Sequence, residues 1–81
     1  MVLFLGVITM YFRRIYELRT DHDLTQKAVA AMLDMNLQVY RRYEKGDRDI
    51  PLWALIRLAD YYGTSTDYLL GRTNDPSKPN A

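Results

Sequence analysis

Hydrophobic residues recur every three or four positions along most of the chain after residue 10. This is the spacing of one face of an α-helix, in which successive residues are rotated by about 100°. The first such row predicts a helix over about 11–20, ended by the polar stretch 21–23. Its members are Phe12, Ile15, Tyr16 and Leu18. Residues 1–10 show no such period, because they are uncharged and almost wholly hydrophobic.

Capping residues mark out a second and a third helix. Thr25 can accept a backbone N–H at the start of the second helix, and Asn36 can do so at the start of the third. The second helix carries the hydrophobic residues Val29, Ala30, Met32 and Leu33. Residues 34–36 separate the two helices, and Gly46 ends the third by supplying a left-handed conformation.

Proline and glycine residues bound two further helices. Pro51 suits the first turn of the fourth helix, where its missing N–H is no loss, and Gly63 ends that helix. The fourth helix is expected to bury a row made of Leu52, Leu55, Ile56 and Ala59. Thr64 or Ser65 caps a fifth helix. Its hydrophobic residues are Tyr68, Leu69 and Leu70. Because no strand pattern occurs outside residues 2–8, the sequence predicts an all-α fold of five short helices around one core.

The composition is that of one small globular domain. The chain has 81 residues, of which 48% are hydrophobic and 26% are charged, as in ordinary folded proteins. At this length only about 60% of the unfolded surface can be buried, so the core is small. The absence of cysteine excludes disulfides and thiolate metal sites and fits a cytoplasmic location. We expect a hydrophobic N-terminal extension at 1–10, a folded domain at 11–72 and a flexible polar tail at 73–81.

The N-terminal ten residues allow two interpretations. They are too short to span a bilayer, which takes roughly 20 hydrophobic residues, and they lack the features of a secretory signal. No membrane partner is therefore expected. One interpretation is a disordered extension upstream of a functional start at Met10. The other is a strand-like segment, residues 2–8, that pairs with a partner chain as an edge strand or a hydrophobic clasp.

No group of residues in the sequence is suited to catalysis or cofactor binding. His22 is the only histidine, and without cysteine or a second histidine it forms no metal site. Asp21 and Asp23 beside it are explained by a polar loop. The sequence offers no nucleophile–base pair, no phosphate-binding glycine loop and no paired carboxylates at a catalytic spacing. We therefore expect no enzyme activity, no cofactor and no small-molecule substrate.

The second and third helices, joined by a short break, have the form of a helix-turn-helix over about 25–44. The net charge of +1 is uninformative, but basic residues exceed acidic ones between 36 and 48. The basic residues there are Arg41, Arg42, Lys45 and Arg48. Taken alone, this excess fits either a surface that contacts phosphates or a solvated helix face.

The third helix can present a polar face suited to DNA. Its expected core-facing residues are Tyr40 and Tyr43. At about 100° per residue, the opposite face then holds Gln38, Arg42 and Lys45. Arg41 lies on the flank, and Leu37 lies at the N-terminal end, where a recognition helix usually meets base edges. Glutamine can pair with adenine, arginine can pair with guanine, and leucine can contact a thymine methyl group.

Several short motifs along the chain are similar to those of one family. They are Leu24-Thr25-Gln26, Val29-Ala30, Tyr43-Glu44-Lys45-Gly46, Leu58-Ala59-Asp60-Tyr61-Tyr62-Gly63 and Asp67-Tyr68-Leu69-Leu70-Gly71. In this order and spacing they resemble the lambda-repressor-like (Cro/XRE) helix-turn-helix family, over about residues 12–72. The resemblance implies a five-helix DNA-binding fold with the helix-turn-helix at its second and third helices.

The resemblance also implies roles for individual residues. Gln26 would grip a DNA phosphate at the start of the second helix, and Asn36 would cap the third helix and touch the DNA backbone. The implied base-reading positions are Leu37, Gln38 and Arg42. The implied phosphate contacts are Arg41, Lys45 and Arg48. Arg19 and Glu44 correspond to a buried ion pair that orients the reading helix in several members of the family.

Three residues depart from the family pattern. Asp34 replaces the usual glycine of the turn and would adopt its left-handed conformation at some cost. Leu37 is apolar where a polar reader is common, which leaves the base preference there open. Tyr40 replaces an aliphatic residue, so either the core is larger or the hydroxyl reaches outward.

The leading hypothesis is a transcription regulator that binds double-stranded DNA at specific sequences, acting as a repressor and as a homodimer on a palindromic operator. The dimer surface would be either the fifth helix with Leu69 and Leu70, the usual place in relatives, or residues 2–8. The alternative is a protein-interaction module, such as an antitoxin, whose main ligand is a partner protein. Trp53 would suit an interface anchor, and a partly buried surface aromatic explains it equally well.

Overall fold

The computed structural model describes residues 11–78, and within them the chain forms helices and no strand. The helices are α1 (Arg13–Asp21), α2 (Gln26–Met32), α3 (Leu37–Lys45), α4 (Leu52–Tyr62) and α5 (Thr66–Leu69). The prediction of an all-α, five-helix fold is confirmed. The two interpretations of residues 2–8, an extension or a clasp, lie outside the described residues.

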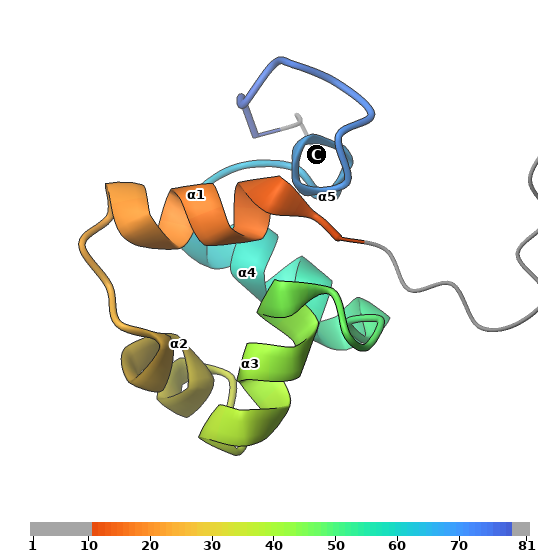
Figure 1. Ribbon diagram of the computed structural model, residues 1–81. Helices are drawn as coiled ribbons and strands as arrows, with labels where there is room; N and C mark the ends of the chain where they lie inside the picture. The colour runs from red at the N-terminus through yellow and green to blue at the C-terminus, as the bar shows by residue number, and fades with distance from the viewer. Residues whose placement is uncertain (1–10, 79–81) are drawn as a thin grey trace, which may run out of the picture.

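The five helices pack around a shared centre (Figure 1). In this view α1 lies above α2 and α3, with α4 behind them and α5 beside the N-terminal end of α1. The α2 and α3 helices contact each other, α1 contacts both α3 and α5, and α4 contacts α5. The α2 and α3 helices therefore form one unit. In Figure 1, α1 lies above this unit and α4 lies behind it.

Side-chain caps set the helix boundaries much as the sequence predicts. The Thr25 hydroxyl accepts the backbone N–H of Ala28 at 3.0 Å, and the Asn36 side chain accepts that of Gln38 at 2.7 Å. Of the two candidate caps of the fifth helix, Ser65 is the one used, at 2.9 Å from Tyr68 N. The fourth helix begins one residue after Pro51, which is its N-cap.

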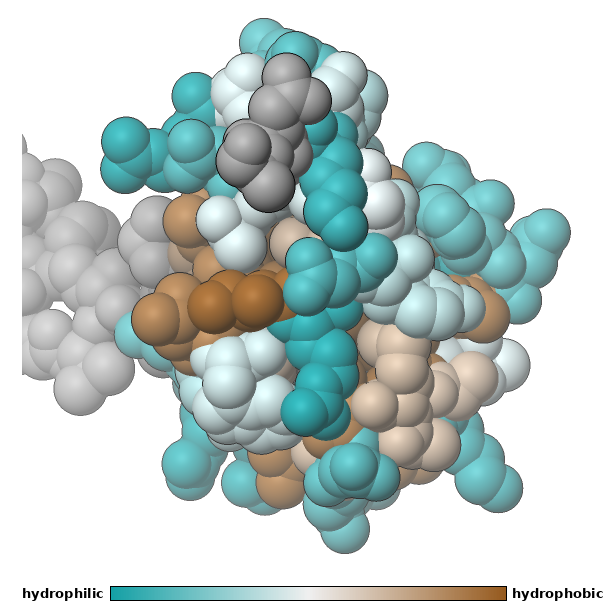
Figure 2. Space-filling view, turned by 180° about the vertical axis from the view of Figure 1, so that it is seen from behind, coloured by the Kyte–Doolittle hydropathy of each residue, from teal (hydrophilic) through white to brown (hydrophobic). Residues whose placement is uncertain are grey.

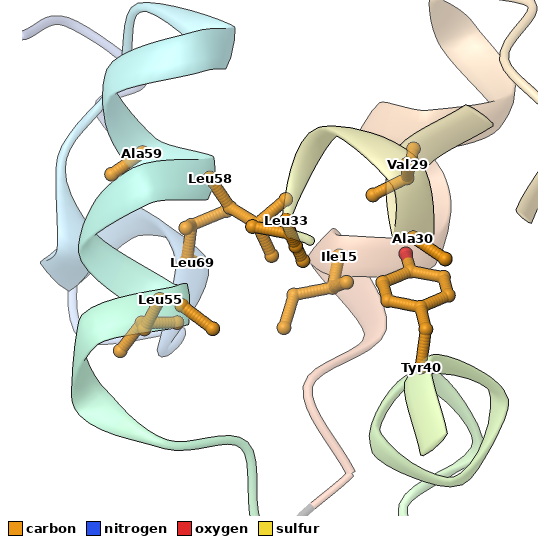
Figure 3. Packing of buried hydrophobic residues seen from close by; sticks show 10 residues of the cluster. Ile15, Val29, Ala30, Leu33, Tyr40, Leu55, Leu58, Ala59 and Leu69 are labelled. Carbon is orange, nitrogen blue, oxygen red and sulfur yellow. The ribbon is translucent and has the colours of Figure 1, made fainter. Parts of the chain in front are cut away.

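The core draws on every helix of the domain (Figure 3). The largest side chains that are less than 2% exposed are Tyr40, Ile15, Leu33, Leu58, Leu69 and Val29. Figure 3 shows the Tyr40 ring directed from α3 toward Ala30 of α2, which is small enough to allow the close approach. Leu69 is only 1% exposed. Of the two residues named for the candidate dimer surface on the fifth helix, Leu69 is therefore part of the core, and Leu70 is half-buried.

The buried row of α4 differs from the predicted one. Ala54 and Leu58 lie in the core with Leu55 and Ala59, whereas Leu52 is 68% exposed and Ile56 is 45% exposed. In α1, Tyr16 is likewise 44% exposed. The helical period allows two neighbouring rows in each helix, and only tertiary packing selects between them. In the view from behind (Figure 2), hydrophobic residues reach the surface beside a band of hydrophilic ones.

Arg14 connects α1 to the segment that follows α5. Its guanidinium donates to the carbonyl of Tyr68 at 2.8 Å, to the carbonyl of Thr73, and to the side chain of Asn74 at 2.7 Å. It also lies 4.0 Å from the centre of the Tyr68 ring, at the distance of a cation–π contact. The beginning of the polar tail predicted at 73–81 is therefore bound to the domain through one side chain.

Candidate nucleic-acid interface

The turn between α2 and α3 has the geometry of a helix-turn-helix. Asp34 adopts a left-handed conformation with φ of 53°, as expected for a residue in the usual glycine position. The backbone N–H of Met35 returns to the carbonyl of Ala30 at 2.9 Å. Asn36 then caps α3, so the turn closes within three residues and fixes the angle between the two helices.

One face of α3 is polar, basic and exposed. Gln38, Arg41, Arg42 and Lys45 are all exposed and, with Asp47, line a shallow hollow of about 240 Å³. Tyr40 on the opposite side is fully buried and Tyr43 is half-buried, so the helical projection made from the sequence is correct. Four of the eight residues predicted to contact DNA therefore share one accessible surface.

The other predicted contact residues are placed differently. Leu37 is half-buried and packs against the core, which leaves only part of its side chain accessible. Asn36 uses its side-chain oxygen for the cap of α3, and its side-chain NH₂ is the group left for a ligand. Arg48 is exposed in the loop after α3, and its backbone N–H lies 3.3 Å from the carbonyl of Arg42.

A buried ion pair joins α1 to α3, as the resemblance implies. The Arg19 guanidinium donates twice to the Glu44 carboxylate, from Nε to Oε2 at 2.7 Å and from Nη2 to Oε1 at 2.9 Å. Only 12% of the Arg19 side chain and 5% of the Glu44 side chain are exposed. Arg19 Nη1 also donates to the carbonyl of Leu24 at 2.8 Å, just before α2. The bidentate ion pair therefore connects α1 and the segment before α2 to α3.

The structure adds three residues to this pair that the sequence analysis did not connect with it. The Tyr40 hydroxyl donates to Glu44 Oε2 at 2.6 Å, and Gln26 Nε2 donates to Glu44 Oε1 at 3.0 Å. Arg41 Nε in turn donates to Gln26 Oε1 at 3.2 Å. We call these five residues, Arg19, Gln26, Tyr40, Arg41 and Glu44, the Glu44 network. Of the two alternatives for Tyr40, the ring lies in the core and the hydroxyl reaches Glu44 instead of solvent.

The Glu44 network determines the charge state of its members. Burial by itself would raise the pKa of the Glu44 carboxyl, but hydrogen bonds from Arg19, Tyr40 and Gln26 outweigh it and lower the pKa below its ordinary value. Burial and the hydrogen bond to Glu44 raise the pKa of the Tyr40 hydroxyl well above its usual range. Glu44 is therefore ionised and Tyr40 is a neutral donor at neutral pH.

The described residues offer no sign of a metal centre or a membrane segment. Within residues 11–78, no group of three or more histidine, cysteine, aspartate or glutamate side chains is arranged to hold a metal ion. In the same part of the chain, no helix is both long and apolar enough to cross a membrane.

The fold and the α3 face define a helix-turn-helix domain, and comparison with known families agrees. A family described as helix-turn-helix, HTH_3, matches residues 15–69 of the chain. The chain belongs to this family, of the Cro/XRE type, which comprises DNA-binding transcription regulators and not enzymes. The resemblance seen in the sequence is thereby confirmed.

The relatives found among curated proteins are named as transcriptional regulators or repressors. The chain is 39% identical over 83% of its length to the uncharacterized HTH-type transcriptional regulator YobD of Bacillus subtilis, and 37% identical over 84% to the HTH-type transcriptional regulator ImmR of the same organism. It is 35% identical over 67% of its length to the cryptic phage CTXphi transcriptional repressor RstR of Vibrio cholerae. The chain spans 60%, 53% and 49% of these three relatives. No solved structure gave a significant match.

Proposed function

We propose that the chain binds double-stranded DNA at specific sequences, with α3 in the major groove, and regulates transcription. The observation that carries the proposal is the exposed face of α3, where Gln38, Arg41, Arg42 and Lys45 lie together. Gln38 and Arg42 have the side chains that pair bidentately with adenine and guanine edges. Each such pair discriminates against a wrong base by about 1–3 kcal/mol.

Phosphate contacts would surround these base contacts. Arg41 in the middle of α3, Lys45 at its C-terminal end and Arg48 in the loop that follows present three exposed cations. Gln26 at the N-terminus of α2 keeps one side-chain N–H beyond the one it gives to Glu44. Asn36 would contribute its side-chain NH₂ to the backbone. Leu37 would supply only the accessible part of its side chain, as a contact to a thymine methyl group. Backbone contacts of this kind set the position of the protein, and base contacts select the sequence.

We further propose that the protein acts in the cytoplasm as a repressor and as a homodimer on a palindromic operator. Two copies related by a two-fold axis would place their α3 helices in successive major grooves, one helical turn apart. The exposed hydrophobic side chains of α4, Leu52, Trp53 and Ile56, support contact with a second protein chain. The repressor role is supported by the name of the RstR relative.

The salt dependence of DNA binding tests the phosphate part of this proposal. Affinity for a duplex should fall with salt with a slope of about 0.9 per phosphate contact. Lys45→Ala and Arg48→Ala should each reduce the slope by about 1. Arg13→Ala is the matched control, because Arg13 is an exposed arginine on α1 paired with Glu17 at 3.1 Å. Equal slopes for all four proteins would contradict DNA binding through α3.

The alternative function, a protein-interaction module such as an antitoxin, is favoured by one observation. Trp53 is 49% exposed beside Leu52, and the Arg57 guanidinium lies 5.2 Å from its ring centre. Sedimentation distinguishes self-association through α4, self-association through residues 1–9 and binding of a different protein. It compares the native chain, Trp53→Lys and a chain lacking residues 1–9. A dimer lost in Trp53→Lys supports self-association through α4, and a dimer lost only in the truncated chain assigns the contact to residues 1–9. A monomer in all three contradicts the homodimer and leaves the hydrophobic residues of α4 for a different partner protein.

A further inference from the structure

Tyr40 carries a hydroxyl that the core does not need. Its ring fills the space between α3 and α2, and phenylalanine would fill the same space (Figure 3). A buried hydroxyl is costly unless it is hydrogen-bonded. This one donates to Glu44 Oε2 at 2.6 Å, four residues later on the same helix. The hydroxyl therefore acts on Glu44.

Glu44 has its hydrogen-bonding capacity filled. Oε2 accepts from Arg19 Nε and from the Tyr40 hydroxyl, and Oε1 accepts from Arg19 Nη2 and Gln26 Nε2. A carboxylate has about four acceptor positions, so four donors fix its rotation about the last side-chain bond. Removing the Tyr40 donor frees one position of Oε2 and allows the carboxylate to turn relative to Gln26.

The chain of hydrogen bonds reaches the exposed face of α3. Gln26 directs its amide nitrogen to Glu44 and its amide oxygen to Arg41 Nε, so both ends of the amide are held. Arg41 is exposed, and its two Nη groups remain available to a ligand. Three hydrogen bonds in series thus connect the buried hydroxyl of Tyr40 to a guanidinium on the polar face.

We infer that Tyr40 is a positioning residue for DNA recognition. Acting through Glu44 and Gln26, its hydroxyl fixes the orientation of the Arg41 side chain and the position of α3 on the duplex. The inference rests on the proposed function. Specific binding requires backbone and base contacts in one register, whereas non-specific binding is mainly electrostatic and tolerates small displacements. Loss of the hydroxyl should therefore weaken specific binding more than non-specific binding.

The test compares Tyr40→Phe with Tyr43→Phe, which removes a hydroxyl from the same helix outside the Glu44 network. Both variants are measured at a temperature where circular dichroism shows them fully folded, so a loss of stability does not enter. The first readout uses the protein without DNA: nitrogen-15 relaxation of the Arg41 Nε–H and of the Gln26 side-chain amide. We expect increased motion of both groups in Tyr40→Phe and native values in Tyr43→Phe.

The second readout is the ratio of affinities for the duplex that the native protein enriches from a random pool and for a scrambled duplex. We expect the ratio to fall about tenfold in Tyr40→Phe, the scale of one hydrogen bond to a charged group, and to stay native in Tyr43→Phe. Arg41→Lys keeps the charge but lacks the bond from Nε to Gln26. It should lower the ratio similarly while leaving the core untouched, so the inference remains testable even if Tyr40→Phe folds poorly.

The possible outcomes are distinguishable. Native relaxation of Arg41 and Gln26 in Tyr40→Phe would overturn the inference without reference to DNA. Altered relaxation with an unchanged affinity ratio, in a native protein that prefers its enriched duplex, would also overturn it. A native protein with no preference for any duplex would contradict the proposed function itself, and the positioning role for DNA would fall with it.

Discussion

Replacing Glu44 by glutamine removes the negative charge that faces Arg19 while keeping nearly the same shape. In the native protein this carboxylate accepts two hydrogen bonds from Arg19, one from Tyr40 and one from Gln26. The glutamine amide group would point N–H donors at a guanidinium that has only donors of its own. Arg19, with 12% of its side chain exposed, would be left charged and unpaired.

The expected loss is large for so small a domain. Breaking a buried ion pair by removing one partner costs about 3–5 kcal/mol, and we take the lower end because some of the Arg19 side chain is exposed. A chain of this size has a free energy of unfolding of about 4–12 kcal/mol. Glu44→Gln should therefore remove about 3 kcal/mol, and lower the melting temperature by about 12–24 °C.

Glu17→Gln is the matched control. Glu17 pairs with Arg13 at 3.1 Å on the surface of α1, with 75% of the Arg13 side chain and 44% of the Glu17 side chain exposed. A pair of this kind contributes about 0.3–0.5 kcal/mol. Urea unfolding at neutral pH, followed by circular dichroism, gives the free energy of unfolding of native protein and both variants. If Glu44→Gln cost no more than Glu17→Gln, the Glu44 network would not hold the domain together and the reasoning would be refuted.

Three further predictions concern pH and backbone conformation. Because the pKa of Glu44 is lowered in the folded state, its contribution to stability is present above the ordinary pKa of 4.5 and is lost as the pH falls through the pKa of the folded protein. Urea unfolding between pH 7 and pH 2 should show this loss in the native protein and a smaller loss in Glu44→Gln. An alanine in a left-handed conformation costs roughly 1–2 kcal/mol of stability, and Gly63→Ala, whose added Cβ would have nothing within 4 Å, should cost only this amount. Gly46→Ala should cost more, because its added Cβ would lie 3.0 Å from Tyr11 Cβ. Similar melting temperatures for the two variants would contradict this. Asp34→Gly should stabilise the protein by up to about 1 kcal/mol by relieving a φ of 53°, and a lower melting temperature would count against strain in the turn.

Local signals in the sequence predicted the helices and their ends. Thr25 and Asn36 cap the helices they were expected to cap, and Gly46 ends α3 with φ of 88°. These features depend on a few neighbouring residues, so they can be read from short stretches of sequence. The polar face of α3 was also predictable, because burial of Tyr40 determines which residues lie opposite.

Features that depend on contacts between distant residues were not predictable in the same way. Leu52 and Ile56 fit the helical period of α4, but packing in the shared core buries the neighbouring row with Ala54 and Leu58 instead. The hydrogen bond from Gln26 to Glu44 joins residues 18 positions apart and leaves no periodic pattern. The Arg19–Glu44 pair was expected only because of the resemblance to a family.

The central claim is that the exposed face of α3 selects a DNA sequence. It is tested most directly by selecting duplexes from a random DNA pool at about physiological salt, with Arg42→Ala and the control Arg13→Ala run beside the native protein. We expect an enriched inverted repeat with half-sites about one helical turn apart, unchanged in Arg13→Ala and altered or lost in Arg42→Ala. No enrichment by the native protein, or the same enriched sequence with Arg42→Ala, would contradict it.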